Sequence, residues 1–313
     1  MSALVVFSVI SVAVGCLPAG NTAPSIPAFD EDRAFELLKK QVGFGPRYPG
    51  VEGHELTAEF IRCQLKPYAD GVKTQEFSDV VRGKTLSMSN IIAHFNPSAA
   101  RQILLAAHWD SRPTADMEID PAKKKQPIPA ANDGGSGVAV LLELARIFAK
   151  QKPDVGVVMV FFDGEDYGSD SGGMFLGSTY FAKNLSDGAS FDGKPFKIEY
   201  GILLDMVGDK DLAIPQEQSS VDAAPEVVQK VWRMAEKMGY RDVFVPDVGM
   251  SIQDDHIPLI EAGVKCIDLI DFNYGPWHTL DDTPDKCSPK SLRIVGEVVA
   301  NVIYAEPPVE AAR

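Results

Sequence analysis

The sequence predicts an α/β fold in which a mixed, mostly parallel central sheet is flanked by helices on both faces. Short apolar runs alternate with segments of helical length and periodicity, which is the pattern of α/β proteins. The run VGVVMVFF at 155–162 is apolar throughout, as expected of a strand that is covered on both faces. The 313 residues show no internal repeat and no clean domain boundary. We therefore expect residues 29–313 to form a single domain.

The first half of this domain is expected to contain two helices and then three strands. The segment 30–42 has helical spacing of Phe35, Leu37, Leu38 and Val42, and the glycines and prolines of 43–50 end it. The remaining elements are a helix at 51–65, strands at 73–77 and 89–95 joined by a turn at 82–84, and a buried strand at 102–107. A long polar loop, expected to be mobile, then reaches residue 131.

Strands and helices alternate in the second half. Asn132-Asp133-Gly134-Gly135 opens a helix over 136–151, and the apolar strand 155–162 comes next. The elements expected after it are helices at 178–185, 221–238 and 289–304, with strands at 200–204 and 264–270.

The composition indicates a soluble globular protein, with 45% hydrophobic and 24% charged residues. A net charge of -14 argues against a nucleic-acid partner, because phosphate binding requires clustered Lys and Arg. Cys63, Cys266 and Cys287 lack metal-binding spacing, which argues against a cysteine-based metal site. Cys266 lies in an apolar strand and is expected in the core, while one disulfide of undetermined pairing is compatible with an exported protein.

Residues 1–28 carry no charged side chain. Their apolar stretch has the length of a signal-peptide core and is shorter than the roughly 20 residues of a membrane span. The box 13–16 (AVGC) resembles a bacterial lipoprotein cleavage site, with Cys16 as the residue to be lipidated. We expect an export signal and tether, and a periplasmic or outer-membrane lipoprotein of a bacterium. A buried N-terminal strand is the less favoured alternative, because the polar, proline-rich 18–27 follows.

Three acids, Asp163, Glu165 and Asp166, come directly after the apolar strand 155–162. Catalytic and binding groups of parallel sheets gather at the carboxyl ends of the strands. Two neighbouring carboxylates there repel each other and lose hydration, so a compensating charge is needed. A metal ion bound by one acid, with the other left for proton transfer, satisfies this requirement. The alternative is a solvated acidic loop.

The same arrangement recurs at other strand ends. His108 and Asp205 each follow an apolar strand, Asp133 opens a helix, and His278 lies in the loop after the last strand. Taken singly, Asp133 could cap its helix and His278 could be an ordinary loop histidine. Together they form a histidine and carboxylate set without cysteine, which is typical of catalytic zinc sites that keep an open position.

Five motifs in one order carry a family resemblance, which extends from about Gly43 to the closing helix. They are His108-Trp109-Asp110, Asn132-Asp133-Gly134-Gly135-Ser136-Gly137, Phe162-Asp163-Gly164-Glu165-Asp166, Leu204-Asp205 and His278-Thr279. Together they resemble the superfamily that joins zinc aminopeptidases with glutaminyl cyclases. The resemblance implies the α/β sandwich of zinc aminopeptidases and makes 29–313 a cyclase-like catalytic domain.

Further features resemble the glutaminyl cyclases more than the peptidases. They are the loop 253–258 (QDDHIP) with its extra acid Asp254, Trp277 before His278, and the segment 44–47 (FGPR). The stretches 108–113 and 165–168 are similar to bacterial cyclases with a mammalian-like fold. The chain departs from such cyclases after the paired acids, where it has Gly172-Gly173-Met174-Phe175 in place of a second tryptophan. Packing in the core is the alternative role of Trp277 and Phe175.

This resemblance implies a glutaminyl-peptide cyclotransferase, an acyltransferase that converts N-terminal glutamine of peptides or proteins to pyroglutamate and releases ammonia. One zinc ion is expected on Asp133, Asp166 and His278. Glu165 is expected to move the proton from the attacking amine to the leaving ammonia, within a network that includes Asp205 and Asp254. The residues expected at the substrate are Trp277, Gln253 and Phe175. The protein is expected to be a monomer and to contact a membrane only through a lipid anchor.

Two other functions remain open. In a two-zinc aminopeptidase, His108 and Asp205 would bind a second zinc, Asp133 would bridge the ions, and Glu165 would activate water. A catalytically inactive binding domain is the third hypothesis, and it is disfavoured because neither a ligand nor the Glu base is missing.

Overall fold

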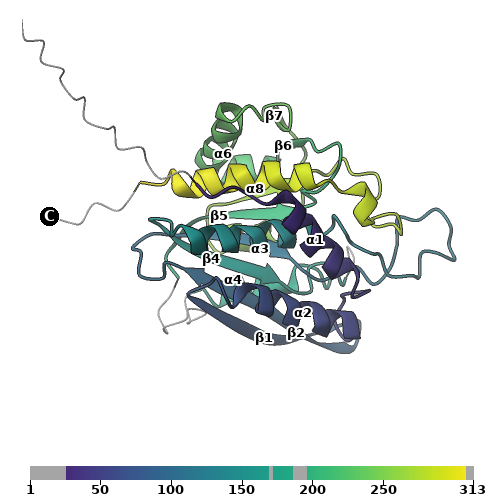
Figure 1. Ribbon diagram of the computed structural model, residues 1–313. Helices are drawn as coiled ribbons and strands as arrows, with labels where there is room; N and C mark the ends of the chain where they lie inside the picture. The colour runs from purple at the N-terminus through teal and green to yellow at the C-terminus, as the bar shows by residue number, and fades with distance from the viewer. Residues whose placement is uncertain (1–25, 169–171, 186–195, 308–313) are drawn as a thin grey trace, which may run out of the picture.

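A six-stranded sheet forms the centre of the protein in a computed structural model that describes residues 26–168, 172–185 and 196–307 (Figure 1). The strands in spatial order are β1 (Gly71–Val81), β2 (Lys84–Phe95), β4 (Gly156–Phe162), β3 (Gln102–His108), β5 (Ile198–Asp205) and β8 (Cys266–Ile270). The last four run parallel to one another, while β2 pairs antiparallel with both β1 and β4. The predicted mixed, mostly parallel sheet is confirmed.

Helices cover both faces of this sheet. The helices are α1 (Glu31–Val42), α2 (Glu52–Leu65), α3 (Gly135–Lys150), α4 (Leu176–Lys183), α5 (Gln218–Ala223), α6 (Pro225–Lys237), α7 (His256–Glu261) and α8 (Pro289–Tyr304), with a short 3-10 turn at Pro284–Lys286. Helices α1, α3 and α8 pack together on one face, and α4 and α7 pack together on the other. Side chains of β4 alternate between the two cores, with Met159 in one and Val158 in the other. The run 155–162 is apolar throughout because both faces of its strand are covered.

The structure differs from the sequence prediction around residue 224. The predicted helix 221–238 is two helices, because Pro225 has no N–H to continue α5 and instead begins α6. A small parallel sheet of β6 (Ile214–Gln216) and β7 (Phe244–Val248) was not predicted, and neither was α7. The predicted hairpin turn is present, with positive φ at Arg82 and Gly83.

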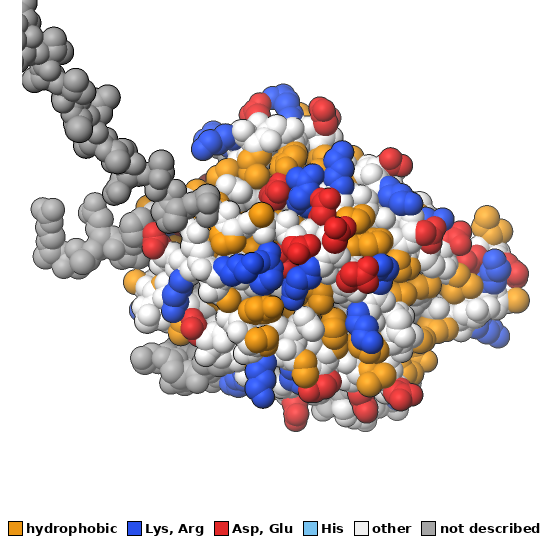
Figure 2. Space-filling view, viewed as in Figure 1, with side chains coloured by type: hydrophobic (Ala, Val, Ile, Leu, Met, Phe, Trp, Pro, Cys, Tyr) orange, Lys and Arg blue, Asp and Glu red, His pale blue; other side chains and the backbone are white. Residues whose placement is uncertain are grey.

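The cysteines and the surface of the described residues agree with a globular protein. Cys266 is buried as predicted, and no disulfide joins the three cysteines of the described residues. None of the described helices has the length and apolarity that crossing a membrane requires. On the face in Figure 2, Lys and Arg lie among Asp and Glu and form no single basic patch. The predicted signal and Cys16 lie outside the described residues.

Candidate active site

The acids and histidines predicted from the sequence gather at one edge of the sheet. Strand β3 ends at His108, β4 ends just before Asp163, and β5 ends at Asp205. Because β3 is parallel to both β4 and β5, these carboxyl ends lie side by side. Two groups of buried side chains there have ligand atoms within 4.8 Å of one another, and both include Asp133: Asp133, Asp166 and His278, and His108, Asp133 and Asp205.

Glycines bring the start of α3 close to this edge. Gly134 has a φ of +75°, and a Cβ there would lie 2.7 Å from the His108 ring. A Cβ on Gly137 would lie 2.1 Å from the Leu204 carbonyl oxygen of β5. The glycines of the Asn132–Gly137 motif are therefore required to place Asp133 beside His108.

The first group has the geometry of a metal site. His278 Nε2 lies 3.7 Å from Asp133 Oδ2 and 3.5 Å from Asp166 Oδ1. Donor atoms that share a tetrahedral zinc ion are about 3.3 Å apart, so the spacing is suitable. Among the described residues Asp166 Oδ2 is buried without a hydrogen-bond partner, while Oδ1 pairs with Arg112. Burial and the neighbouring Asp133 together raise the pKa of Asp166 to about 7. An ion at this position would supply the missing partner of Asp166.

The second group is centred on His108. His108 Nε2 lies 3.1 Å from Asp133 Oδ1 and 3.2 Å from Asp205 Oδ1. Burial opposes a charge on this ring, but Asp205 and Glu165 outweigh it and raise the His108 pKa well above its usual value. A protonated His108 ring carries one positive charge, which offsets one of the negative charges around it. The same atoms have metal-ligand spacing, so distances alone permit a second ion.

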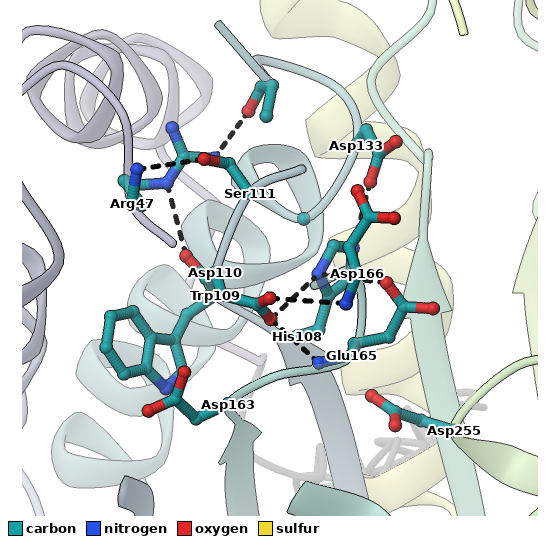
Figure 3. A network of polar contacts seen from close by, with 12 residues as sticks. Arg47, His108, Trp109, Asp110, Ser111, Asp133, Asp163, Glu165, Asp166 and Asp255 are labelled. Carbon is teal, nitrogen blue, oxygen red and sulfur yellow. Dashed lines mark hydrogen bonds and ion pairs between the residues drawn. The ribbon is translucent and has the colours of Figure 1, made fainter. Parts of the chain in front are cut away.

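Glu165 is buried beside both groups. Burial raises its pKa well above the usual value, and Asp166, Asp254 and Asp255 add to the effect. Its backbone is held by Asp110, whose two carboxylate oxygens accept from the N–H of Glu165 at 3.1 Å and of Asp166 at 3.2 Å (Figure 3). Asp110 thus fixes the turn that presents the two acids.

The predicted network acid Asp254 and the predicted substrate residues Trp277, Gln253 and Phe175 differ in burial. Asp254 is buried, and burial together with Asp205 and Asp255 raises its pKa well above the usual value. Trp277 is half-buried and stacks on the His278 ring at a centroid distance of 3.9 Å. Gln253 is exposed, and Phe175 is half-buried in a left-handed conformation, with its N–H donating to the Glu165 carbonyl.

Sequence reasoning missed several residues that support the site. Asp282 accepts from the N–H groups of Asn132 and Asp133, and fully buried Arg47 donates to the carbonyls of Trp109, Pro129 and Ala130. Asp163, for which the sequence suggested no role, accepts from His54 Nε2 and from the Ser89 N–H. Three of these residues stand in segments quoted above, Arg47 in 44–47, Asp110 in His108-Trp109-Asp110 and Asp163 in the motif 162–166, whereas Asp282 has no such local signal.

Comparison with known proteins extends this description. The family model of peptidase family M28 matches residues 90–303. The chain belongs to peptidase family M28. Its relatives include a glutaminyl-peptide cyclotransferase of Drosophila melanogaster, 30% identical, with 76% of this chain and 70% of the relative covered. Aminopeptidase YwaD of Bacillus subtilis is also 30% identical, with 87% of this chain but only 56% of the relative covered.

The similar solved structures likewise include both glutaminyl cyclases and exopeptidases. The glutaminyl cyclase of Tannerella forsythia is 38% identical with a TM-score of 0.84, and it covers 90% of this chain and 100% of its own. A Zn-dependent exopeptidase of Parabacteroides distasonis has 36% identity, a TM-score of 0.85 and the same coverage. The predicted fold and the predicted superfamily are therefore confirmed.

Proposed function

We propose that the protein is a zinc-dependent glutaminyl-peptide cyclotransferase, which converts N-terminal glutamine of peptides and proteins to pyroglutamate and releases ammonia. The observation that carries this proposal is the similarity to glutaminyl cyclases along nine-tenths of the chain, at up to 38% identity. The buried acid network around Glu165, which includes Asp254, agrees with proton transfer at a leaving nitrogen.

Asp133, Asp166 and His278 are proposed to hold one zinc ion. They offer two carboxylates and an imidazole, a donor set that zinc accepts, and the unpaired Asp166 Oδ2 is suited to a cation. Zinc held by these three residues would polarise the side-chain amide carbonyl of the substrate glutamine and so make its carbon more electrophilic.

Glu165 is proposed to transfer the proton in this reaction. The substrate α-amine forms a bond to the amide carbon, the bond to the amide nitrogen breaks, and ammonia leaves. Glu165 accepts the proton that the amine loses and donates it to the departing nitrogen, so one residue serves as base and then as acid. The neighbouring Asp205 and Asp254 share the proton network. Because amine and carbonyl belong to one molecule, correct orientation supplies much of the rate enhancement.

Three side chains are proposed to orient the glutamine. Trp277 packs on the glutamine side chain, and Phe175 and Gln253 complete the wall. Trp277 already has one face against His278, so its position is tied to the proposed zinc ligand. Phe175 is linked through its N–H to the backbone of Glu165, which ties it to the proton shuttle.

A two-zinc aminopeptidase is the second candidate, because the His108 group has metal-ligand spacing and because a Bacillus aminopeptidase is among the relatives. The pKa of His108 does not separate the two functions, because neighbouring acids outweigh burial and raise the pKa of His278 as well.

One experiment separates the two functions. The protein is incubated with a peptide that begins with glutamine and, separately, with a leucine-aminoacyl reporter, and pyroglutamate, ammonia and free leucine are measured. Pyroglutamate and ammonia in equal amounts support the cyclase. Leucine release without pyroglutamate would overturn it. Zinc per chain, measured by atomic spectroscopy, is expected to be one.

We further propose that 1–28 is an export signal and tether, that 29–313 is a monomeric catalytic domain, and that the protein acts in the periplasm or at the outer membrane. The uncharged first residues and the AVGC box support this location. Cell fractionation of the full chain and of its Cys16→Ser variant tests it. Loss of membrane attachment in the variant is expected, and a cytoplasmic wild-type protein would refute export.

A further inference from the structure

The segment 116–118 lies directly against the loop that carries His278. Asp116 Oδ1 is 3.3 Å from His278 Nδ1, the Met117 N–H donates to the His278 carbonyl at 3.2 Å, and Glu118 Oε1 accepts from the Leu280 N–H at 3.1 Å. Three consecutive residues thus hold the side chain of the histidine, its carbonyl, and the backbone two residues beyond it. A polar loop that looked unstructured from its sequence is a support for the proposed zinc ligand.

His278 needs such support because its backbone is strained. Its φ is +54°, in the left-handed region that a side chain with a Cβ adopts only at a cost. Strain of this kind persists where surrounding contacts over-determine the conformation. The contacts from 116–118 do so, and they leave Nε2 directed towards Asp133 and Asp166.

Asp116 also reaches a second proposed ligand through Arg112. The Arg112 guanidinium donates from Nε and Nη2 to the two Asp116 oxygens, at 2.8 and 3.0 Å. Its remaining nitrogen, Nη1, pairs with Asp166. One exposed-loop carboxylate therefore connects to two of the three proposed ligands.

We propose that Asp116 is a positioning residue of the metal site: it accepts a hydrogen bond from the His278 Nδ1–H, fixes the tautomer that offers Nε2 to the ion, and holds Arg112 against Asp166. This inference rests on the proposed zinc ligand set. A carboxylate on the second nitrogen of a metal-bound histidine orients the ring and increases its basicity, and losing such a partner typically costs 10–100-fold in metal affinity.

Zinc affinity, measured on the folded full chain by competition with a chromogenic chelator, tests this proposal. Asp116→Ala is expected to weaken zinc binding about 10–100-fold. Asp116→Asn keeps an acceptor oxygen for the His278 N–H, so its loss is expected to be smaller. Asp120→Asn removes the same charge from the same loop, where the Asp120 carboxylate accepts from the Ala122 N–H, and its zinc affinity is expected to be that of the wild type.

Two outcomes would overturn the proposal. Asp116→Ala with wild-type zinc affinity would reduce Asp116 to a surface residue, and equal losses in Asp116→Ala and Asp116→Asn would exclude the hydrogen bond as the cause. Asp133→Ala distinguishes this failure from failure of the ligand set. If Asp133→Ala also binds zinc as tightly as the wild type, then the proposed zinc site itself is wrong.

Discussion

The two histidines of the site, His278 and His108, contact the same carboxylate, Asp133, but have different surroundings. The Asp116 carboxylate lies 3.3 Å from Nδ1 of His278. The other ring nitrogen, Nε2, faces Asp166, whose Oδ2 has no hydrogen-bond partner among the described residues. His108 presents Nε2 to two carboxylates at 3.1 and 3.2 Å, and its Nδ1 has no hydrogen-bond partner among the described residues. Neighbouring acids outweigh burial and raise the pKa of both histidines, so the two rings differ in their partners and not in the direction of the pKa shift.

This comparison teaches that residue type at a strand end does not determine the role. Both histidines lie among acids at the same edge of one sheet, because each belongs to a group that contains Asp133. The difference lies in the partner of the second ring nitrogen, which influences the tautomer of each ring.

Replacing each histidine in turn by alanine is the strongest test of this comparison. His278→Ala is expected to lose its zinc and at least 10³-fold in kcat/KM, because a ligand is missing. His108→Ala is expected to retain one zinc per chain by atomic spectroscopy, although its activity falls because Asp133 and Asp205 lose their cation. A wild type with two zinc ions and a His108→Ala variant with one would instead establish the peptidase arrangement.

Glu165→Gln separates proton transfer from metal binding. The amide cannot carry the proton, so kcat is expected to fall roughly 10²–10⁴-fold, the usual range for general acid–base catalysis, while the zinc content stays the same. Ammonia release and zinc content are measured on the same sample. Activity close to that of the wild type would remove Glu165 from the mechanism.

Metal removal is expected to reverse the pH dependence of stability. Burial raises the pKa values of Asp166, Asp255 and Asp282 to about 7, above their usual value of 3.8. Groups with a raised folded-state pKa favour folding fully below about pH 4, and this contribution is lost as the pH rises through 7. The metal-free protein is therefore expected to melt roughly 5 °C lower at pH 8 than at pH 5.

Zinc is expected to counteract this loss, because at pH 8 fewer protons compete for Asp166. Thermal unfolding followed by circular dichroism at both pH values, with and without a chelator, measures the effect. A metal-free protein that is more stable at pH 8 would show that these acids are ionised in the fold at both pH values.

Trp277→Ala gives the smallest expected effect. Loss of the aromatic surface against the glutamine side chain is expected to raise KM about 3–10-fold, which corresponds to the usual strength of such stacking. Phe272→Leu is the matched control, because Phe272 packs against Trp277 at 4.9 Å and is not proposed to contact the substrate. A greater rise in KM for Phe272→Leu than for Trp277→Ala would show that Trp277 acts through packing and not through contact with the substrate.

The sequence by itself determined the strands, most helices, and the residues at the strand ends. Apolar runs such as 155–162 must be buried, and parallel strands bring their carboxyl ends to one edge, so Asp133, Glu165, Asp166 and His278 could be grouped without coordinates. The prediction of one helix at 221–238 was wrong because its helical periodicity outweighed the signal of Pro225. Strands β6 and β7 were missed because such short strands have too little periodicity.

Only the tertiary structure decided what surrounds each of these residues. Asp116 and Asp282 stand in polar segments where an acid needs no explanation, and their partners come from distant parts of the chain. A hydrogen bond between such segments has no periodicity, and it forms only once the sheet has set the spacing between loops. The sequence could therefore name the ligand candidates, whereas the contacts that separate His278 from His108 required the folded chain.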